Sequence, residues 1–567
     1  MSKRAAWYSV PFVLLVTGAA SAGPASLLRD IQPGPGPSTF FDPVAELDGK
    51  LLFLADDGVH GLEPWISDGT EDGTRLVRDV RVGDSGSGPD GSGLHPHRFT
   101  IWQGRAYFGA NDGVGGFELW ATDGTEQGTA RVLDVMPGPE ASSPLVLAGL
   151  DSLLVFAAYD GEHGTELWAT DGTEGGTRLV RDLNPGPNGS LPFAFARLGD
   201  AVIFGCYADL SLTLWRTDGT DDGTFPLPVP PGDFDVPIVH QGALWFITYS
   251  DAVRPSELWR SDGTVAGTER VADLGVKQSF SLTVAGETLF FVGWEPTAGY
   301  ELWASDWTGP GTHRVRDLWP GGLSSGVSQL TAVGETLFFT AQTPGHGHEL
   351  WKSDGTDAGT AIVREIVPGS QGSTVGELRE VAGVLLFAAF DDEGFGVWRS
   401  DGTEGGTFPV ERFADPRPST GPREFLSVGR RVYFTAYDPS TGREPWKARA
   451  AILTHQPGRA LQDLGDEVRA LGLPPGLARS LTAKLAAAEA SLSRRGGERS
   501  TLRLLDAFAS EVRARTPSEI SDAAASDLQE FAEEIAGLLD PASLPIPARA
   551  FPAARSSGRG PLVLEGR

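Results

Sequence analysis

Short runs of alternating hydrophobic and polar residues follow one another from residue 24 to residue 450, and they form a repeating unit. Four strands are predicted in the unit at residues 328–366, at 328–333, 336–341, 348–353 and 361–366. A Gly-Glu pair separates the first two, and an Asp-Gly-Thr turn follows the third, which is typical of antiparallel hairpins. Four such strands in about 47 residues match one blade of a β-propeller.

One tryptophan recurs in each unit, in the motif Glu-Leu-Trp-x-Ser/Thr-Asp-Gly-Thr-x-x-Gly-Thr. Successive copies are separated by 44 to 55 residues. We interpret this tryptophan as the residue that packs one blade on the next; a ring of exposed tryptophans that binds sugars is the alternative. The nine positions are Trp65, Trp120, Trp168, Trp215, Trp259, Trp303, Trp351, Trp398 and Trp446.

The two ends of the repeat region predict a closed ring. The last unit stops at Trp446-Lys447, without the turn and without a fourth strand. Residues 27–31, followed by Pro-Gly, match the fourth strand at 179–183, so the N-terminus is expected to complete the last blade and remove two exposed sheet edges. Nine blades exceed the usual range of about four to eight. Eight blades, two smaller rings and an open β-solenoid are therefore the alternatives.

The signature Glu-Leu-Trp-Ala-Thr-Asp-Gly-Thr at 166–173 has copies that begin at Glu118, Glu257 and Glu349. This repeat resembles the ELWxxDGT repeat family of exported bacterial proteins over about 420 residues. The resemblance implies an exported β-repeat protein and no established activity. The fifth and sixth units are the shortest, and their loops are where specialisation is expected. Departures from the signature are Pro64, Thr213, Trp307, Gly396 and Pro445.

The first 22 residues have the features of a secretory signal peptide. Lys3 and Arg4 precede an apolar stretch, and Ala20-Ser21-Ala22 offers a cleavage site. An N-terminal membrane anchor is the alternative. No later stretch reaches 18 uninterrupted apolar residues, and the single cysteine, Cys206, excludes a disulfide framework. We expect export to the periplasm, the cell surface or the medium of a bacterium.

Composition supports a turn-rich, acidic protein. With 74 Gly and 41 Pro among 567 residues, a mainly helical chain is excluded. Residues 451–567 contain 14 Lys+Arg and 15 Asp+Glu, so residues 1–450 carry −28 of the net charge of −29. Nucleic acid is thereby excluded as a partner of the repeat region. A protein or glycan ligand remains open, and a monomer is expected.

Residues 451–540 predict a small bundle of amphipathic helices. Thr516-Pro517-Ser518-Glu519 has the pattern of a capping box at a helix start. Residues 541–567, rich in Pro, Arg and Ser, predict a flexible tail. The apolar stripes comprise Leu461, Leu464, Val468 and Leu471; Leu477, Leu481, Leu485 and Leu492; Leu505, Phe508 and Val512; and Leu528, Phe531, Ile535 and Leu538.

Residues 480–485 and 505–508 of this bundle are similar to the FIMAH module found at the ends of exported bacterial proteins. Ala509 and Ser510 stand where that module usually has Ile and Asn. The resemblance implies an accessory role in attachment or docking, with no catalytic chemistry.

An aspartate follows each tryptophan strand and is the obvious candidate for metal binding. Acidic loops offer oxygen ligands for Ca²⁺, but an Asp before Gly also accepts hydrogen bonds from its own backbone and fixes a turn. Periodic placement favours the turn, and no cofactor is predicted apart from Ca²⁺ as the alternative. The eight positions are Asp68, Asp123, Asp171, Asp218, Asp262, Asp306, Asp354 and Asp401.

Histidines and glutamates also recur at fixed positions. His60, His163 and His346 occupy one slot on units far apart in a ring, so they cannot share a metal; His346-Gly347-His348 and His95-Pro96-His97 lack further ligands nearby. We interpret the repeated glutamates as turn or ladder partners. These are Glu118, Glu166, Glu257, Glu301 and Glu349.

No nucleophile elbow, phosphate loop or dinucleotide fingerprint has its required strand and helix context. The leading hypothesis is an exported, non-enzymatic propeller that acts as a binding or scaffold protein, with no catalytic residue assigned. The alternatives are a hydrolase or lyase of extracellular glycans, which needs two nearby carboxylates, and a calcium-stabilised surface protein.

Overall fold

The computed structural model describes residues 24–38, 44–87, 99–208, 211–230, 232–249, 255–413 and 421–539. The predicted signal peptide, the His95-Pro96-His97 pair and the predicted tail at 541–567 lie outside the described residues. Two compact units divide between His455 and Gln456.

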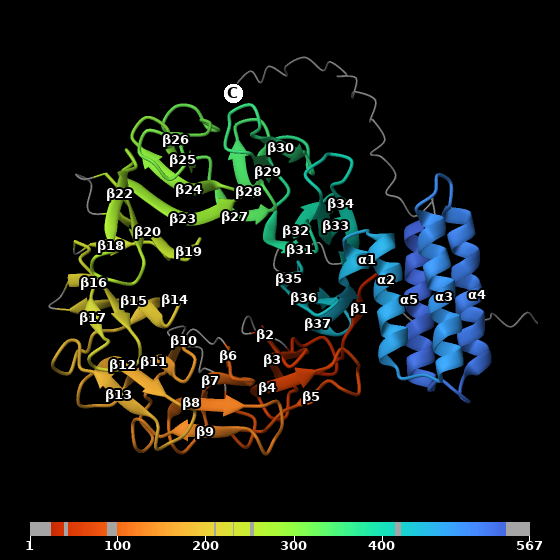
Figure 1. The fold of residues 1–567 in the computed structure, drawn as a ribbon, viewed down its shortest axis with the longest axis horizontal. Coiled ribbons are helices and arrows are strands. Elements are labelled where there is room, and N and C mark those ends of the chain that lie inside the picture. Colours follow the sequence, from red (N-terminus) through yellow and green to blue (C-terminus); the bar gives the residue numbers. More distant parts are fainter. Residues whose placement is uncertain are drawn as a thin grey trace, which may run out of the picture. The chain divides into compact units, whose positions relative to one another are not determined.

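The first unit is one β-propeller of nine blades, each an antiparallel sheet of four strands, with a fifth short strand in blade 5 (Figure 1). Blades 1 to 3 contain β2 (Val44–Leu47), β3 (Lys50–Asp56), β4 (Leu62–Ser67) and β5 (Arg75–Leu76); β6 (Thr100–Trp102), β7 (Arg105–Asn111), β8 (Phe117–Thr122) and β9 (Ala130–Leu133); and β10 (Leu145–Gly149), β11 (Leu154–Tyr159), β12 (Thr165–Thr170) and β13 (Arg178–Arg181). Blades 4 and 5 contain β14 (Phe193–Leu198), β15 (Ala201–Ala208), β16 (Ser211–Thr217) and β17 (Phe225–Pro226); and β18 (Asp233–Phe234), β19 (Ile238–His240), β20 (Ala243–Tyr249), β21 (Glu257–Ser261) and β22 (Glu269–Asp273).

The remaining blades follow the same order. Blades 6 and 7 contain β23 (Gln278–Ala285), β24 (Thr288–Glu295), β25 (Gly299–Ser305) and β26 (His313–Arg314); and β27 (Ser328–Val333), β28 (Thr336–Thr343), β29 (Gly347–Ser353) and β30 (Ala361–Arg364). Blades 8 and 9 contain β31 (Gly376–Val381), β32 (Val384–Asp391), β33 (Gly394–Ser400) and β34 (Phe408–Phe413); and β35 (Arg423–Val428), β36 (Arg431–Asp438), β37 (Gly442–Arg449) and β1 (Ser26–Leu27).

The N-terminal strand closes the ring, as the sequence predicts. Ser26 pairs with Lys447 and Leu27 with Trp446, so β1 is the fourth strand of the last blade, although it is shorter than the predicted 27–31. The inner strands contact one another around the ring, and β35 contacts β2. The alternatives of eight blades, of two rings and of an open solenoid are therefore wrong.

An arginine in the fourth-strand motif Val-Arg-Asp-Leu joins neighbouring blades. Arg181 Nη1 donates to Thr224 O at 2.9 Å, and Arg316 Nη1 donates to Thr360 O at 3.0 Å, in each case across to the blade that follows. Arg29 makes the same bond to Thr74 O of blade 1. The N-terminal segment therefore supplies the inter-blade contact of a complete fourth strand as well as its backbone pairing.

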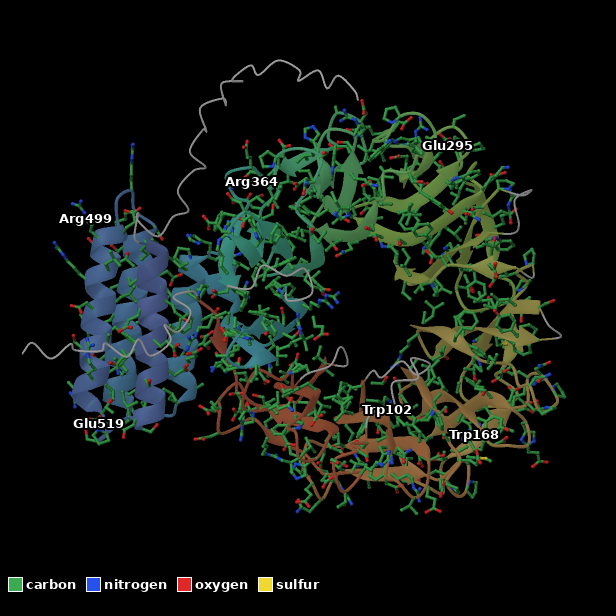
Figure 2. All side chains as sticks on the ribbon, turned by 180° about the vertical axis from the view of Figure 1, so that it is seen from behind. Trp102, Trp168, Glu295, Arg364, Arg499 and Glu519 are labelled. Carbon is green, nitrogen blue, oxygen red and sulfur yellow. The ribbon has the colours of Figure 1, made fainter. Side chains whose placement is uncertain are left out.

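The hydrophobic core lies between blades. Trp65 lies in a buried cluster with Val428 and Tyr433 of blade 9 and with Leu28 and Ile31. Eight of the nine repeat tryptophans are at most 8% exposed, and Trp168 is half-buried against Trp102 and other residues of blade 2 (Figure 2). Each tryptophan packs on the preceding blade, which is the position of a packing residue rather than of an exposed sugar-binding ring.

Because successive strands are antiparallel, the ring has two different faces. The connections from second to third strand and from one blade to the next lie at one end of the strands, which we call the loop face. The turns from first to second and from third to fourth strand lie at the other end, the turn face.

A short helix, α1 (Ala450–Leu453), ends the first unit, and four helices form the second. These are α2 (Pro457–Ala470), α3 (Pro475–Leu492), α4 (Glu498–Arg515) and α5 (Asp522–Leu539). They pack in sequence, and α5 returns to α2. Figure 2 labels Arg499 and Glu519 in this unit. Leu471, predicted in the first stripe, follows α2 and is 40% exposed.

The predicted capping box at 516–519 is wrong, because α4 runs to Arg515 and α5 begins only at Asp522. Thr516 Oγ1 donates to Val512 O at 2.8 Å, and Glu519 N donates to Arg515 O at 2.8 Å. These groups thus bond the end of the preceding helix instead of the start of the next.

Candidate functional site

The repeated Asp-Gly-Thr-x-x-Gly-Thr segment forms a turn that satisfies its own polar groups. In blade 1, Asp68 Oδ1 accepts hydrogen bonds from Thr70 N at 2.9 Å and from Thr70 Oγ1 at 2.6 Å. Thr70 Oγ1 accepts from Gly73 N, and Thr74 Oγ1 donates to Thr70 O. A Cβ on Gly73 would lie 2.0 Å from the aspartate oxygen, so only glycine permits this approach.

All eight predicted aspartates make these turn contacts on the turn face. Hydrogen bonds from Thr173 lower the pKa of Asp171, so this carboxylate is ionised at neutral pH. Over the described ranges, no three His, Cys, Asp or Glu side chains are grouped so that they could hold a metal ion. The bonds recur at Asp68, Asp123, Asp171, Asp218, Asp262, Asp306, Asp354 and Asp401.

Removing the aspartate should therefore matter more than removing calcium. We expect Asp68→Ala to lower the free energy of unfolding by about 1 kcal/mol, because two hydrogen bonds to the carboxylate are lost. EDTA should leave the melting temperature of the wild type unchanged in differential scanning fluorimetry. A melting temperature that falls with EDTA and recovers with added Ca²⁺ would contradict this interpretation.

The repeated glutamate is a buried acceptor that fixes the connection between blades. Glu118 is fully buried, and its carboxylate accepts from Val135 N at 3.0 Å, from Ser142 N at 2.9 Å and from Ser142 Oγ at 2.5 Å. Val135 and Ser142 belong to the connection between blades 2 and 3. The side chain therefore acts as a clamp within the loop face and is not exposed to a substrate.

Six blades have this glutamate clamp, at Glu63, Glu118, Glu166, Glu301, Glu349 and Glu444. Burial raises the pKa of Glu63, Glu301 and Glu444 to about 7, although each carboxylate accepts several hydrogen bonds. Of the predicted turn partners, Glu257 differs, because its half-buried carboxylate pairs with Arg270 at 2.8 Å.

The raised pKa predicts a pH dependence of stability. Because the folded pKa of Glu63 lies above the unfolded value of 4.5, its stabilising contribution is complete below about pH 4.5 and is lost as the pH rises through about 7. We expect the free energy of unfolding of the wild type to fall, relative to Glu63→Gln, by up to about 3 kcal/mol between pH 4.5 and 7.5. Urea unfolding at several pH values measures this; parallel curves would contradict it, and Glu257→Gln is the control.

The periodic histidines also bond within their own blades. His60 Nδ1 lies 2.8 Å from Asp57 Oδ2, and His163 Nδ1 lies 2.7 Å from Asp160 Oδ2. His346 Nδ1 lies 3.1 Å from Glu365 Oε1. Each histidine thus serves as a local partner of one carboxylate on the loop face.

Blades 4 to 6 break the repeat and bring aromatic side chains together. Phe193 of β14 lies against Tyr207, with ring centroids 6.2 Å apart, and stacks on Phe234 at 5.9 Å. Phe280 of β23 lies 5.5 Å from Tyr300. We call these five residues the aromatic strip.

Asp235 lies between the two parts of the aromatic strip, directly after Phe234. Burial raises the pKa of its carboxyl, and the nearby backbone N–H groups of Val236, Ser281 and Leu282 oppose the shift. Its neighbourhood to Ser281 and Leu282 places Phe234 of blade 5 close to Phe280 of blade 6. The strip therefore follows the inner strands of three consecutive blades, β14, β18 and β23, near their ends at the loop face.

Comparison of blades shows that the fold does not require these rings. Phe193 pairs with the residue after the buried phenylalanine of its second strand, and Phe280 has the same register position. In blades 7, 8 and 9 that position holds Ser328, Gly376 and Arg423. Tyr207 is 41% exposed and Phe280 is 38% exposed, so both present apolar surface to solvent. The strip is thus the best candidate for a binding surface.

The irregular units are evident from the sequence, but the aromatic strip was not predicted from it. Part of its signal is present in the sequence, since Phe193 and Phe280 stand at a repeat position that holds Ser328, Gly376 and Arg423 in blades 7 to 9. The grouping of Phe193 with Phe234, however, depends on the contact between blades.

Trp307, one of the departures from the repeat signature, lies on the turn face. It has a φ of +70° where other units have glycine, its ring stacks on His240 at 4.8 Å, and its Nε1 donates to Glu287 O at 2.8 Å. These contacts join blades 5 and 6, so its role is an inter-blade contact.

In the part of the chain that is described, every helix is too short or too polar to cross a bilayer.

Comparisons with known proteins bear on the fold. No protein-family profile and no curated protein matches the sequence. Among solved structures, the chain is similar to a puromycin hydrolase, at 12% identity and a TM-score of 0.32 over 74% of this chain and 62% of that one. It is also similar to the β-propeller domain of the Trilobed protease from Pyrococcus furiosus, at 11% identity and a TM-score of 0.31 over 54% and 94%.

A further similar structure is one of two prolyl endopeptidases, at 12% identity and a TM-score of 0.35 over 64% of this chain and 55% of that one. The chain spans less than two thirds of the length of the hydrolase and of the endopeptidase. The likeness concerns the fold alone.

Proposed function

We propose that this protein is an exported, non-enzymatic binding or scaffold protein whose ligand-binding surface is the aromatic strip. The observation that carries the proposal is the exposure of Tyr207 and Phe280. In addition, the inner strands of blades 4, 5 and 6 each have a phenylalanine at, or next to, one register position. In blades 7 to 9 the same position holds Ser, Gly or Arg. A repeat fold gains nothing from exposing these rings, whereas a binding surface does.

The rest of the proposal follows from the sequence. The features of residues 1–22 support export, and the signature Glu-Leu-Trp-x-x-Asp-Gly-Thr supports membership of the ELWxxDGT repeat family. We assign the helical unit, with its likeness to the FIMAH module, an accessory role in attachment. No cofactor is needed for this function.

The carboxylates that repeat in the blades have structural roles that favour binding over hydrolysis. Glycosidic hydrolysis needs two carboxylates about 5 to 10 Å apart that reach the substrate. The six clamp glutamates are buried and accept hydrogen bonds from the chain itself. These carboxylates are therefore not available to a substrate.

Arrays of glycans and peptides, followed by a turnover assay on every ligand found, test this function. We expect binding of the wild type without product release, and at least tenfold weaker binding by Phe280→Ser. The matched control is Ile101→Ser, since Ile101 is 41% exposed on an inner strand of blade 2. Release of sugars or peptides, or equal binding by Phe280→Ser and the wild type, would overturn the proposal.

A further inference from the structure

The exposed rings of the aromatic strip lie beside polar groups that can bind hydroxyls. Gln278 is exposed, and its Oε1 accepts a hydrogen bond from the hydroxyl of Tyr300. Ser281 is exposed at the bulge next to Phe280 and has a φ of +63°. Apolar ring surface with amide and hydroxyl groups at its edge complements a sugar, which has C–H faces and hydroxyl edges.

Phe280 directly precedes a β-bulge that also occurs in the inner strands of blades 4, 7, 8 and 9. The pairing of β23 with β24 shifts between Phe280 and Thr283, where Ser281 and Leu282 oppose no single partner. Leu282 is 8% exposed and packs in the core, while Phe280 is 38% exposed. A bulge re-aims a side chain in this way. The Phe280 ring also packs against the Tyr300 ring, with centroids 5.5 Å apart, so it is positioned by its own blade before any ligand binds.

Charge distinguishes between classes of ligand. Residues 1–450 carry a net charge of −28 in the sequence, and such an excess of negative charge repels polyanions. A cation next to the strip in the sequence is Lys277, whose Nζ lies 5.9 Å from the centroid of the Trp294 ring. A cationic peptide would find Asp233 as the exposed carboxylate beside the strip, while Asp235 is partly buried. An uncharged polymer is not repelled by the acidic repeat region and needs no ion pair, so the aromatic rings and polar groups of the strip are enough to bind it.

We propose that the aromatic strip binds an uncharged glycan chain, which lies along the inner strands of blades 4 to 6 and stacks sugar rings on Tyr207 and Phe280. This inference rests on the proposed function and names its ligand class. Tyr207 and Phe193 on blade 4 and Phe280 and Tyr300 on blade 6 provide two stacking positions, and a chain reaches both where a single sugar reaches one.

Affinity electrophoresis of the full chain tests the ligand class. Native gels contain hydroxyethylcellulose, xyloglucan, galactomannan or dextran as uncharged probes, and alginate or pectate as acidic probes. We expect retardation in at least one uncharged gel and none in the acidic gels. Phe280→Ser and Phe193→Ser should each weaken the retardation at least tenfold, because each removes an aromatic ring from a stacking position. Both variants should still fold, since blade 7 has serine at this position.

Ile101→Ser is the control and should migrate like the wild type, and circular dichroism checks that every variant is folded. Oligosaccharides of increasing length then separate a chain from a single sugar, since affinity should rise until both stacking positions are filled. Retardation by acidic gels alone, or binding of array peptides alone through Phe280, would overturn the glycan inference and leave the proposed function standing. Binding of no probe of either class would overturn both.

Discussion

Deletion of residues 23–31 is expected to abolish the closed ring and to lower the free energy of unfolding by at least about 5 kcal/mol. The deletion removes β1 from the edge of β37 and removes Leu28 and Ile31, which are 1% and 4% exposed, from the cluster between blades 9 and 1. Each buried side chain contributes about 2 kcal/mol, and the bond from Arg29 to Thr74 O is lost as well.

Thermal melts and hydrogen exchange measure this effect. Amides of β37 that pair with β1 should exchange much faster in the deleted chain, and the unpaired edge should promote aggregation. Leu28→Asp in the full chain should reproduce most of the loss, whereas Leu323→Asp, at a side chain that is 59% exposed, should have little effect. A deletion that changed neither the melt nor the exchange would show that closure contributes no stability.

Glu118→Ala is expected to destabilise the protein by about 3 kcal/mol. The substitution leaves Val135 N, Ser142 N and the Ser142 hydroxyl without their acceptor, in a site where the glutamate is fully buried. A buried donor without a partner costs about 1–3 kcal/mol, and the connection between blades 2 and 3 loses its anchor.

The matched control is Glu257→Ala, at the same position of the repeat in blade 5. Its carboxylate pairs with Arg270 and is partly exposed, so a loss of less than about 1 kcal/mol is expected. Urea unfolding compares the two variants. Equal destabilisation by the two substitutions would contradict the role of Glu118 as a buried clamp, because a partly exposed ion pair such as that of Glu257 contributes little to stability.

Sequence periodicity predicted nine blades in a closed ring, and the structure was needed to exclude eight blades, two rings and an open solenoid. Alternation and turn residues act over a few positions, so the strands at 328–333 and 361–364 were predictable from local chemistry. The incomplete last unit and residues 27–31 together predicted the closing strand. The turn at Asp68 was predictable for the same reason, since its hydrogen bonds among Asp68, Thr70, Gly73 and Thr74 join residues at most four apart.

The capping pattern at 516–519 failed because a short polar motif bonds either to the helix before it or to the helix after it. Thr516 and Glu519 bond residues of α4, and the sequence alone does not favour one of these neighbours. The motif at 516–519 therefore marked a helix boundary, and packing in the bundle decided that it is the end of α4 and not the start of α5.

By itself, the sequence determined the repeated strands, the turns and the nine units, because each depends on short-range pattern, and matching of the two ends favoured closure of the ring. Eight blades, two rings and an open solenoid were excluded only by the tertiary structure, through the pairing of β1 with β37. Only the tertiary structure decided that Glu118 bonds residues 17 and 24 positions away and that Phe193, Phe234 and Phe280 line neighbouring inner strands. Those relations arise from contacts between blades and connections, where residues far apart in the chain share one buried site or one exposed surface.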